Sequence, residues 1–303
     1  MPELPEVETV RAGLNELLPG RVFATVTHDT EKSFPNAATD VNAFLIDASV
    51  TVVKRRAKVL IIELSSNYSL VIHLKMTGQL VFVSPETRFG AGHPNDSLVG
   101  RLPDKSTRVE FTFKDQSRLF FNDQRKFGWV RLLPTAEVPN IDFMRKIGPE
   151  PLDAAFTARE FVERLQRRKN TSIKAALLDQ TVVAGVGNIY ADESLWGAKI
   201  HPATLVRNVS RQKLHTLFNE LQYVLNLAIQ KGGSSDKNYV NAEGKKGSYL
   251  SFARVFRREG QPCPRCGTTI VKLRVAGRGT HICPNEQRLV KHQVSPHKGG
   301  VAV

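Results

Sequence analysis

The sequence predicts an α+β protein of several domains, in which an antiparallel β-sandwich with a leading helix precedes a helical domain and a small cysteine-containing module. Two changes of pattern and the clustering of all cysteines near one end support this prediction. Short β-rich runs dominate up to about residue 134, and helical periodicity replaces them after residue 152. Proline and glycine punctuate residues 135–152, which we interpret as an irregular linker.

The N-terminal domain, residues 1–134, begins with a predicted helix at 5–18, where apolar residues recur at helical spacing. Short strands separated by turn residues follow. They are predicted at 50–53, 59–64, 70–74, 80–83, 109–113, 119–122 and 129–133. Strands of this length and spacing are typical of an antiparallel sandwich or barrel. Residues 84–107 are rich in Pro, Gly, Asn and Asp and are predicted to form a surface loop.

Residues 153–248 are predicted to form a helical domain, with helices at 158–166, 172–178, 191–196 and about 210–230. The last of these has one continuous apolar face. A loop rich in Gly, Ser and Lys, residues 232–247, follows it. The cysteine module occupies residues 249–290, and the tail 291–303 is predicted to be disordered.

Composition limits the possible function classes. Of the 303 residues, 41% are hydrophobic, which suffices for one large or two medium domains. No apolar run approaches the roughly 18 residues of a membrane span, and the acidic start of the chain lacks the basic and apolar segments of a secretory signal. We therefore expect a cytoplasmic protein with no membrane contact. The net charge of +14 favours a polyanionic partner, of which nucleic acid is the commonest.

The three cysteines predict a metal site rather than a disulfide framework, because their number is odd and they lie close together. Cys263-Pro-Arg-Cys266 is followed after sixteen residues by Cys283-Pro-Asn-Glu286. Two CxxC knuckles at this separation normally bind one tetrahedral Zn²⁺ through four thiolates, and here Glu286 stands at the fourth position.

We expect one structural zinc ion held by Cys263, Cys266, Cys283 and Glu286. A carboxylate oxygen can bind zinc, but three sulfur ligands with one oxygen are less usual. A histidine could supply the fourth ligand instead, and the candidates are His281, His292 and His297. The alternative is a ribbon that holds little metal and is stabilised by packing.

The start of the chain carries a possible nucleophile. Pro2 is a small second residue, which favours removal of Met1 and would leave a free secondary amine. An α-amino group has a pKa of about 8, so a useful neutral fraction exists near pH 7. Neutral amines attack electrophilic carbon and give cationic iminium species. Glu3 could exchange protons and Glu6 could hold the cation, although prolines and acidic residues also simply begin helices.

The string Met1-Pro-Glu-Leu-Pro-Glu-Val-Glu-Thr-Val resembles the N-terminus of the formamidopyrimidine-DNA glycosylase family, bacterial enzymes that excise oxidised purines. The resemblance extends in register over nearly the entire chain. It implies that Pro2 is the nucleophile, that Glu3 donates a proton and that Glu6 supports the iminium. Arg55-Arg-Ala-Lys58 matches the family's lysine motif, which implies that Lys58 contacts a phosphate beside the lesion and assists elimination.

Two further segments resemble the parts of this family that fill the void left by an everted nucleotide. The first, His-Leu-Lys-Met-Thr-Gly, implies that Met76 enters that space. The second, Asn-Asp-Gln-Arg-Lys-Phe-Gly, implies that Arg125 pairs with the orphaned base and that Phe127 wedges into the stack. Unstacking a base costs energy that such side chains offset, although Met76 and Phe127 taken singly also fit core positions. One departure is Ser106, where many relatives carry a phosphate-contacting histidine.

The helical domain contains Lys169-Asn-Thr-Ser-Ile-Lys174 and Val-Ala-Gly-Val-Gly-Asn188, and the second resembles the helix–two-turn–helix of the same superfamily. The resemblance implies that Asn188 hydrogen-bonds a phosphate while Lys169 and Lys174 add charge, contacts that position a duplex without reading it. In the cysteine module, Ala-Gly-Arg278-Gly-Thr-His resembles the hairpin tip whose arginine enters the minor groove and aids the second elimination. The loop 232–247 matches the family's lesion-reading loop.

The resemblance implies a bifunctional DNA glycosylase and AP lyase. We expect a monomer that acts on double-stranded DNA containing a damaged base, and that removes 8-oxoguanine and formamidopyrimidines through a Schiff base on Pro2 with β,δ-elimination. One alternative is an endonuclease VIII-like glycosylase for oxidised pyrimidines, which Leu4 and the long loop disfavour. The other is a non-catalytic DNA-binding repair factor, against which Pro2, Glu3 and Lys58 argue.

Overall fold

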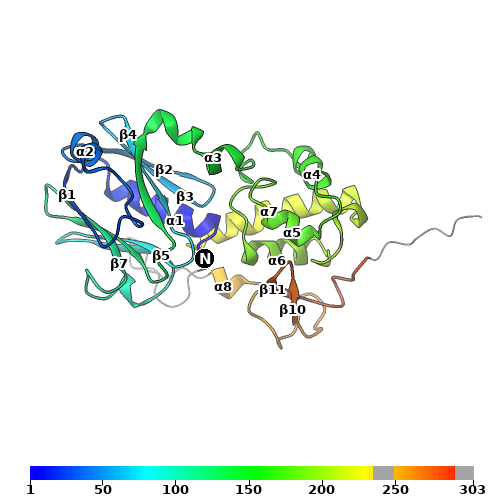
Figure 1. Ribbon diagram of the computed structural model, residues 1–303. Helices are drawn as coiled ribbons and strands as arrows, with labels where there is room; N and C mark the ends of the chain where they lie inside the picture. Colours follow the sequence, from blue (N-terminus) through cyan, green and yellow to red (C-terminus); the bar gives the residue numbers. More distant parts are fainter. Residues whose placement is uncertain (235–248, 291–303) are drawn as a thin grey trace, which may run out of the picture.

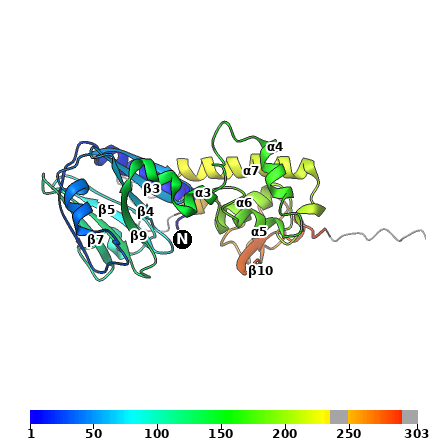
Figure 2. The same cartoon turned by 45° about the horizontal axis from the view of Figure 1, so that its top comes forward.

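A computed structural model of the chain describes residues 1–234 and 249–290. Most of the predicted lesion-reading loop 232–247, the predicted disordered tail and the candidate ligands His292 and His297 lie outside these residues. Two lobes lie side by side, and Figures 1 and 2 place the N-terminus between them. Within the described ranges, no helix combines the length and the apolar character needed to cross a membrane.

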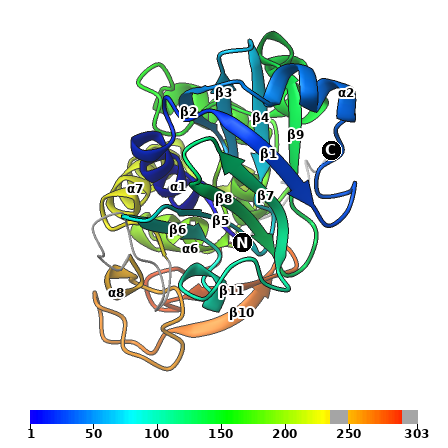
Figure 3. The ribbon, with the colours of Figure 1, turned by 90° about the vertical axis from the view of Figure 1, so that its left-hand side faces the viewer.

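The N-terminal lobe is the predicted antiparallel β-sandwich. One sheet has the strand order β1-β7-β8-β5-β6 and the other the order β2-β3-β4-β9 (Figure 3). The strands are β1 (Phe23–His28), β2 (Val50–Arg56), β3 (Val59–Leu64), β4 (Tyr68–His73), β5 (Gly78–Val83), β6 (Arg88–Gly92), β7 (Thr107–Phe113), β8 (Arg118–Asp123) and β9 (Trp129–Pro134). Alternate residues of the two inner faces pack into one core.

The leading helix α1 (Leu4–Leu17) buries Val7, Val10 and Leu14 against this core. It contacts β2 of one sheet and β6 of the other, so the first residues of the chain have a fixed position at the end of the sandwich. The ring of Phe89 on β6 occupies the space that a Cβ on Gly13 would need. Glycine at position 13 therefore lets β6 pack closely on the helix.

Several elements differ from the sequence prediction. Residues 84–107 are not wholly a surface loop, because β6 pairs along β5 and buries Phe89 and Ala91, and η2 (Asp96–Leu98) follows it. Strand β1 was not predicted, and neither were the helical turns α2 (Ala38–Asp40) and η1 (Val41–Leu45). Strand β1 alternates only weakly between buried and exposed residues, which explains why its pattern gave no signal.

The stretch 135–152 is not irregular throughout, which corrects the linker prediction. It contains η3 (Thr135–Asn140) and α3 (Asp142–Lys146). Val138 and Met144 from these turns pack on Val59 and Val71 at the outer face of β3 and β4. This apolar contact offsets the cost of ordering a proline-containing segment.

The second lobe is helical, as predicted. It comprises α4 (Ala158–Gln166), α5 (Ile173–Leu178), α6 (Asn188–Gly197), η4 (Val206–Asn208), α7 (Arg211–Gln230) and α8 (Tyr249–Phe252). Side-chain oxygens of Thr157, Ser172 and Ser210 cap α4, α5 and α7. The buried face of α7 packs on α6, and the antiparallel hairpin of β10 (Val271–Val275) and β11 (Arg278–Ile282) lies against α6.

Candidate active site

A cavity of about 370 Å³ lies at the junction of the two lobes, within the roughly 300–1,000 Å³ range of ligand pockets. Residues from the chain start, from the turn between β2 and β3, from the start of α6 and from the β10–β11 hairpin line it. Of the candidate residues named from the sequence, the cavity brings together Pro2, Glu3, Glu6, Lys58, Met76, Asn188 and Arg278.

Two glycines of the helical lobe let the chain start approach closely. The backbone N–H of Leu4 donates to the carbonyl oxygen of Gly185 at 3.0 Å. Gly185 has φ +78°, and a Cβ there would meet the Leu4 side chain, whereas a Cβ on Gly187 would overlap the Glu3 carboxyl group. These glycines therefore serve the docking of the N-terminal segment, a purpose that the sequence pattern did not reveal.

The Glu3 carboxyl group is buried at the N-terminus of α6. Its Oε1 accepts a hydrogen bond from the Ile189 N–H at 3.0 Å, and its Oε2 has no hydrogen-bond partner among the described residues. Burial raises the pKa of Glu3 to about 7, against the opposing effect of the nearby Lys58 charge. At neutral pH the group is thus poised to give or take a proton.

Lys58 follows the turn at Ala57 and is also buried. Its Nζ donates to the Val186 carbonyl oxygen at 2.9 Å, which connects the sandwich to the helical lobe. Burial lowers the pKa of Lys58, while Glu3 and Glu6 act in the opposite direction and Arg278 lowers it further. Glu150 fixes the turn by accepting hydrogen bonds from the side chains of Arg55 and Arg56.

Glu6 is held by donors from three separate segments. Its Oε2 accepts from the Glu3 N–H at 2.8 Å, and its Oε1 accepts from the Tyr190 hydroxyl at 2.6 Å and from the Ser234 N–H at 2.8 Å. Burial raises the pKa of Tyr190 well above its ordinary value, so the hydroxyl remains a donor. Tyr190 on α6 thus fixes the carboxylate that lies next to the N-terminal residues.

Met1 covers the end of the chain and lines the cavity with 47% of its surface exposed, while Pro2 is buried beneath it. Burial lowers the pKa of the terminal amine on Met1, and the charges of Glu3 and Glu6 oppose this shift. The Pro2 nitrogen lies one residue further along the chain, directly before Glu3. A larger neutral, nucleophilic fraction follows from a lowered amine pKa.

Arg278 reaches the cavity from the tip of the β10–β11 hairpin. Ala276 and Gly277 both have positive φ, as a two-residue hairpin turn requires, and Arg278 pairs with Val275 directly after it. The turn therefore directs an exposed arginine toward the cavity. Asn188 at the start of α6 lies beside it and donates from Nδ2 to the Gly279 carbonyl oxygen at 3.0 Å.

Lys174 and Lys169 do not join the cavity. Lys174 is fully buried, and its Nζ lies 2.6 Å from Asp192 Oδ1 and 2.7 Å from Thr280 Oγ1. It connects the hairpin to α6, so the structure gives it no exposed ammonium for the phosphate contact expected from the sequence. Lys169 is exposed in the turn after α4.

The expected void-filling residues lie on two neighbouring turns. Met76 is partly buried and lines the cavity, whereas Arg125 and Phe127 are exposed, with the guanidinium 4.9 Å from the ring centre. Asp123 organises both turns, because it accepts from the Phe127 N–H at 2.8 Å and from the Thr77 hydroxyl. An aromatic ring with 46% of its surface exposed is not a core residue, which fits the wedge expectation.

Sequence reasoning missed further residues that line the cavity, among them His93, Phe256 and Arg257. His93 follows β6, inside the stretch expected to be a loop, and burial together with the charge of the terminal amine lowers its pKa. Phe256 and Arg257 reach the cavity from the segment after α8. Arg257 has φ +57°, an uncommon conformation for a side chain of this size. A lone histidine and a basic run carried no motif that could have identified them.

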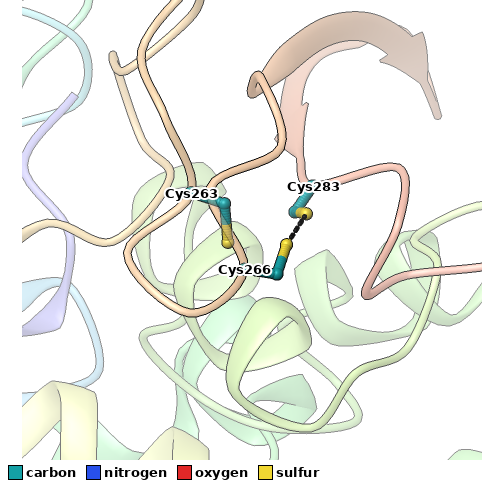
Figure 4. A group of neighbouring side chains, drawn as sticks. All are labelled: Cys263, Cys266 and Cys283. Carbon is teal, nitrogen blue, oxygen red and sulfur yellow. Dashed lines mark hydrogen bonds between the residues drawn. The ribbon is translucent and has the colours of Figure 1, made fainter.

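Near Trp196 of α6, the three cysteines converge (Figure 4). Their sulfur atoms all lie within 4.8 Å of one another, and Cys266 Sγ and Cys283 Sγ are 3.4 Å apart. Three thiolates fit the ligand preference of zinc. Glu286 is not part of this group, since its Oε2 lies 3.0 Å from both Arg265 Nη1 and Lys199 Nζ.

Three family models match the chain. They describe the formamidopyrimidine-DNA glycosylase N-terminal domain over residues 1–130, the formamidopyrimidine-DNA glycosylase H2TH domain over residues 147–239, and the zinc finger found in FPG and IleRS over residues 260–285. Together with the cavity between the lobes, they define the class as DNA glycosylases with an H2TH domain and a zinc finger.

Relatives that match along nearly their whole length identify the family within this class. The formamidopyrimidine-DNA glycosylases of Streptococcus pyogenes serotype M6 and Pelotomaculum thermopropionicum are 40% and 37% identical to this chain. Each match covers 95% of the chain and 99% or 100% of the relative. The chain belongs to the formamidopyrimidine-DNA glycosylase family.

Solved structures agree with this assignment. A mutant of the Lactococcus lactis FPG protein, in complex with a Fapy-dG containing DNA, matches with a TM-score of 0.83 at 34% identity and covers 95% of this chain and 100% of its own. The MutM (FPG) protein of Thermus thermophilus matches with a TM-score of 0.80 at 34% identity, covering 96% and 100%. The family resemblance and the fold class predicted from the sequence are therefore both confirmed.

Proposed function

We propose that this protein excises 8-oxoguanine and formamidopyrimidines from double-stranded DNA and then cleaves the strand as an AP lyase. The observation that carries the proposal is the cavity in which Pro2, Glu3 and Lys58 meet, although they come from separate parts of the chain. The L. lactis relative solved with a Fapy-dG containing DNA supports the substrate class.

In the first step, the neutral nitrogen of Pro2 attacks C1′ of the everted nucleotide, and the bond from C1′ to the damaged base breaks. The leaving base takes up a proton, and the new ammonium loses its own. Glu3 then protonates O4′ while the C1′–O4′ bond opens, which gives the iminium. With a pKa of about 7, Glu3 holds the required proton in about half of the molecules at neutral pH.

Glu6 stabilises the cation formed in this step. Its carboxylate lies within hydrogen-bond distance of the Glu3 N–H and is fixed by Tyr190 and Ser234, so it needs little rearrangement when charge develops. The iminium also acidifies the C2′ proton. Loss of this proton breaks the bond to the 3′ phosphate in β-elimination, and a further proton loss at C4′ breaks the bond to the 5′ phosphate in δ-elimination.

Lys58 and Arg278 are the cations that we assign to the two leaving phosphates. Both line the cavity, on opposite lobes. Cationic donors at a leaving phosphate stabilise its developing charge. Met76, Arg125 and Phe127 would fill the space of the everted nucleotide, while Asn188, with Lys169 further along the helical lobe, would contact the backbone.

We further propose four functional units. Residues 1–134 carry the nucleophile, 153–248 form the DNA-binding H2TH unit with its lesion-reading loop, and 249–290 form the zinc finger that presents Arg278; 135–152 connect the first two. Zinc, held by the thiolates of Cys263, Cys266 and Cys283, would supply structural order to the finger rather than chemistry at the lesion.

Borohydride trapping with a panel of duplexes tests the proposal. The protein without Met1 should form a covalent complex with duplexes containing 8-oxoguanine, because borohydride reduces the iminium. Preferential trapping of dihydrouracil or dihydrothymine would instead favour the endonuclease VIII-like function. Binding of every duplex without trapping of any would favour the non-catalytic DNA-binding factor.

A further inference from the structure

The finger departs from a four-thiolate site at Glu286, and the structure shows what this side chain contacts instead. Its Oε2 lies between Arg265 Nη1 and Lys199 Nζ, at 3.0 Å from each. A glutamate side chain is ordinarily a carboxylate at neutral pH, so both contacts are ion pairs. A carboxylate whose charge two cations already balance has less to gain from a metal ion.

The partners of Glu286 connect the finger to helix α6. The guanidinium of Arg265 lies 3.9 Å from the ring centre of Trp196 and donates to the Trp196 carbonyl oxygen at 3.3 Å. Lys199 lies just beyond the end of α6. Gln287, the next residue after Glu286, donates to the Ile200 carbonyl oxygen at 2.9 Å. The end of the second knuckle is thus used for docking on α6.

Within residues 1–234 and 249–290, the candidate metal ligands that cluster here are the three cysteine sulfur atoms. Among the described residues, no histidine or carboxylate joins the group formed by the three cysteines. His281, a candidate from the sequence, has its Nδ1 3.6 Å from Asp192 Oδ2 instead. Cys266 is exposed while Cys263 and Cys283 are buried, so the site is open on the side of Cys266.

We propose that Glu286 is not a metal ligand but an ionic clasp between the finger and α6, and that the finger binds its metal through three thiolates with the fourth position open to an external ligand. That ligand is water or a small sulfur or nitrogen donor, such as a thiol or an imidazole. Sites that keep an open position exchange ligands, in contrast to closed structural sites. The clasp maintains the position of the finger without contributing to coordination.

Cobalt(II) substitution in the full-length protein tests the ligand set. Thiolate-to-cobalt charge-transfer absorption grows with the number of thiolates, so E286C should raise it by about one third as three thiolates become four. E286Q should have the same cobalt spectrum as the wild type. Added imidazole should shift the visible bands of the wild type and E286Q but not those of E286C.

Three results would overturn the ligand assignment. A spectrum altered by E286Q would identify Glu286 as a ligand, an imidazole-insensitive wild type would show a closed site, and a wild type that takes up no cobalt would remove the metal site itself. K199Q provides the matched control, because it weakens the clasp and changes no candidate ligand. It should have the cobalt spectrum of the wild type.

Thermal unfolding tests the clasp. In the metal-loaded protein, E286Q and K199Q should each lower Tm by about 1–3 °C, because both break a partly exposed ion pair. The double variant should lose little more than E286Q alone, since E286Q already removes the contact to Lys199. Fully additive shifts, or no shift in E286Q, would contradict the clasp.

Discussion

Helix α6 has a carboxylate near each end, and the two surroundings give the same chemical group different properties. At the N-terminus, Glu3 is buried and accepts a backbone hydrogen bond, and burial raises its pKa to about 7. Beyond the C-terminus, Glu286 is paired with Lys199 and Arg265, which lower its pKa. Burial favours a proton-transfer group, whereas two cations favour a permanent charge. The N-terminal end of α6 therefore suits proton transfer, and the C-terminal end suits attachment of the finger.

The largest expected difference between the carboxylates at the two ends of α6 is in the rate of base excision. E3Q removes the proton donor, so single-turnover excision of 8-oxoguanine should fall by a factor of roughly 10²–10⁴. E286Q, which makes the same change away from the cavity, should alter the rate by less than about tenfold. Equal losses in both variants would show that Glu3 acts only through folding.

The two carboxylates should also give stability of opposite pH dependence. The pKa of Glu3 is raised on folding, so its contribution is fully present below pH 4.5 and is lost as pH rises through about 7. Relative to E3Q, the wild type should therefore lose up to about 3 kcal/mol of unfolding free energy between pH 4 and 8. For Glu286 the pKa is lowered, so its contribution is present above pH 4.5 and should be lost as pH falls further. Urea unfolding of the wild type, E3Q and E286Q, extended below pH 4, measures both contributions. Stability differences that change with pH in the same direction for Glu3 and Glu286 would contradict the contrast between the two carboxylates.

Gly187 tests how closely the chain start must approach α6. A Cβ there overlaps the Glu3 carboxyl group, so G187A should destabilise the protein by about 1–3 kcal/mol and reduce excision. In an E3A background the overlap is absent, and the same substitution should cost much less. A cost that does not depend on residue 3 would mean that Gly187 is required for the α6 backbone alone.

Tyr190 gives the smallest expected effect at the catalytic end. Y190F removes the hydroxyl that donates to Glu6, which keeps two backbone donors, so we expect a loss of about 1–2 kcal/mol in chemical denaturation. Trapping yield should fall more than substrate binding, because Glu6 faces the developing cation. A variant with wild-type stability and yield would show that Glu6 does not need this donor.

Much of the fold was predictable because its signals are local. The spacing of apolar residues gave α1, the main strands from β2 to β9 and the long helix α7 close to their observed positions. Strand β6 was missed because glycines interrupt its pattern, and it is stabilised by contact with α1. The turns at 135–146 were missed because prolines interrupt their helical pattern. Their apolar side chains pack on the outer face of β3 and β4.

The site was partly predictable, and for a different reason. Resemblance to known sequences identified Pro2, Glu3 and Lys58, which meet in the cavity. It could not show that Lys174 is buried against Asp192, because the pattern of one helix does not reveal what packs on it from the hairpin. It also could not find His93, whose position in the cavity depends on the pairing of β6 with β5.

Peptide mapping of the borohydride-reduced complex tests the central claim most directly. After digestion of the protein trapped on 8-oxoguanine duplex, mass spectrometry should find the reduced sugar on the N-terminal peptide, at the Pro2 nitrogen of chains that have lost Met1. Chains that retain Met1 should carry no adduct at Pro2. An adduct on Lys58 or another lysine, with the N-terminal peptide unmodified, would contradict the account.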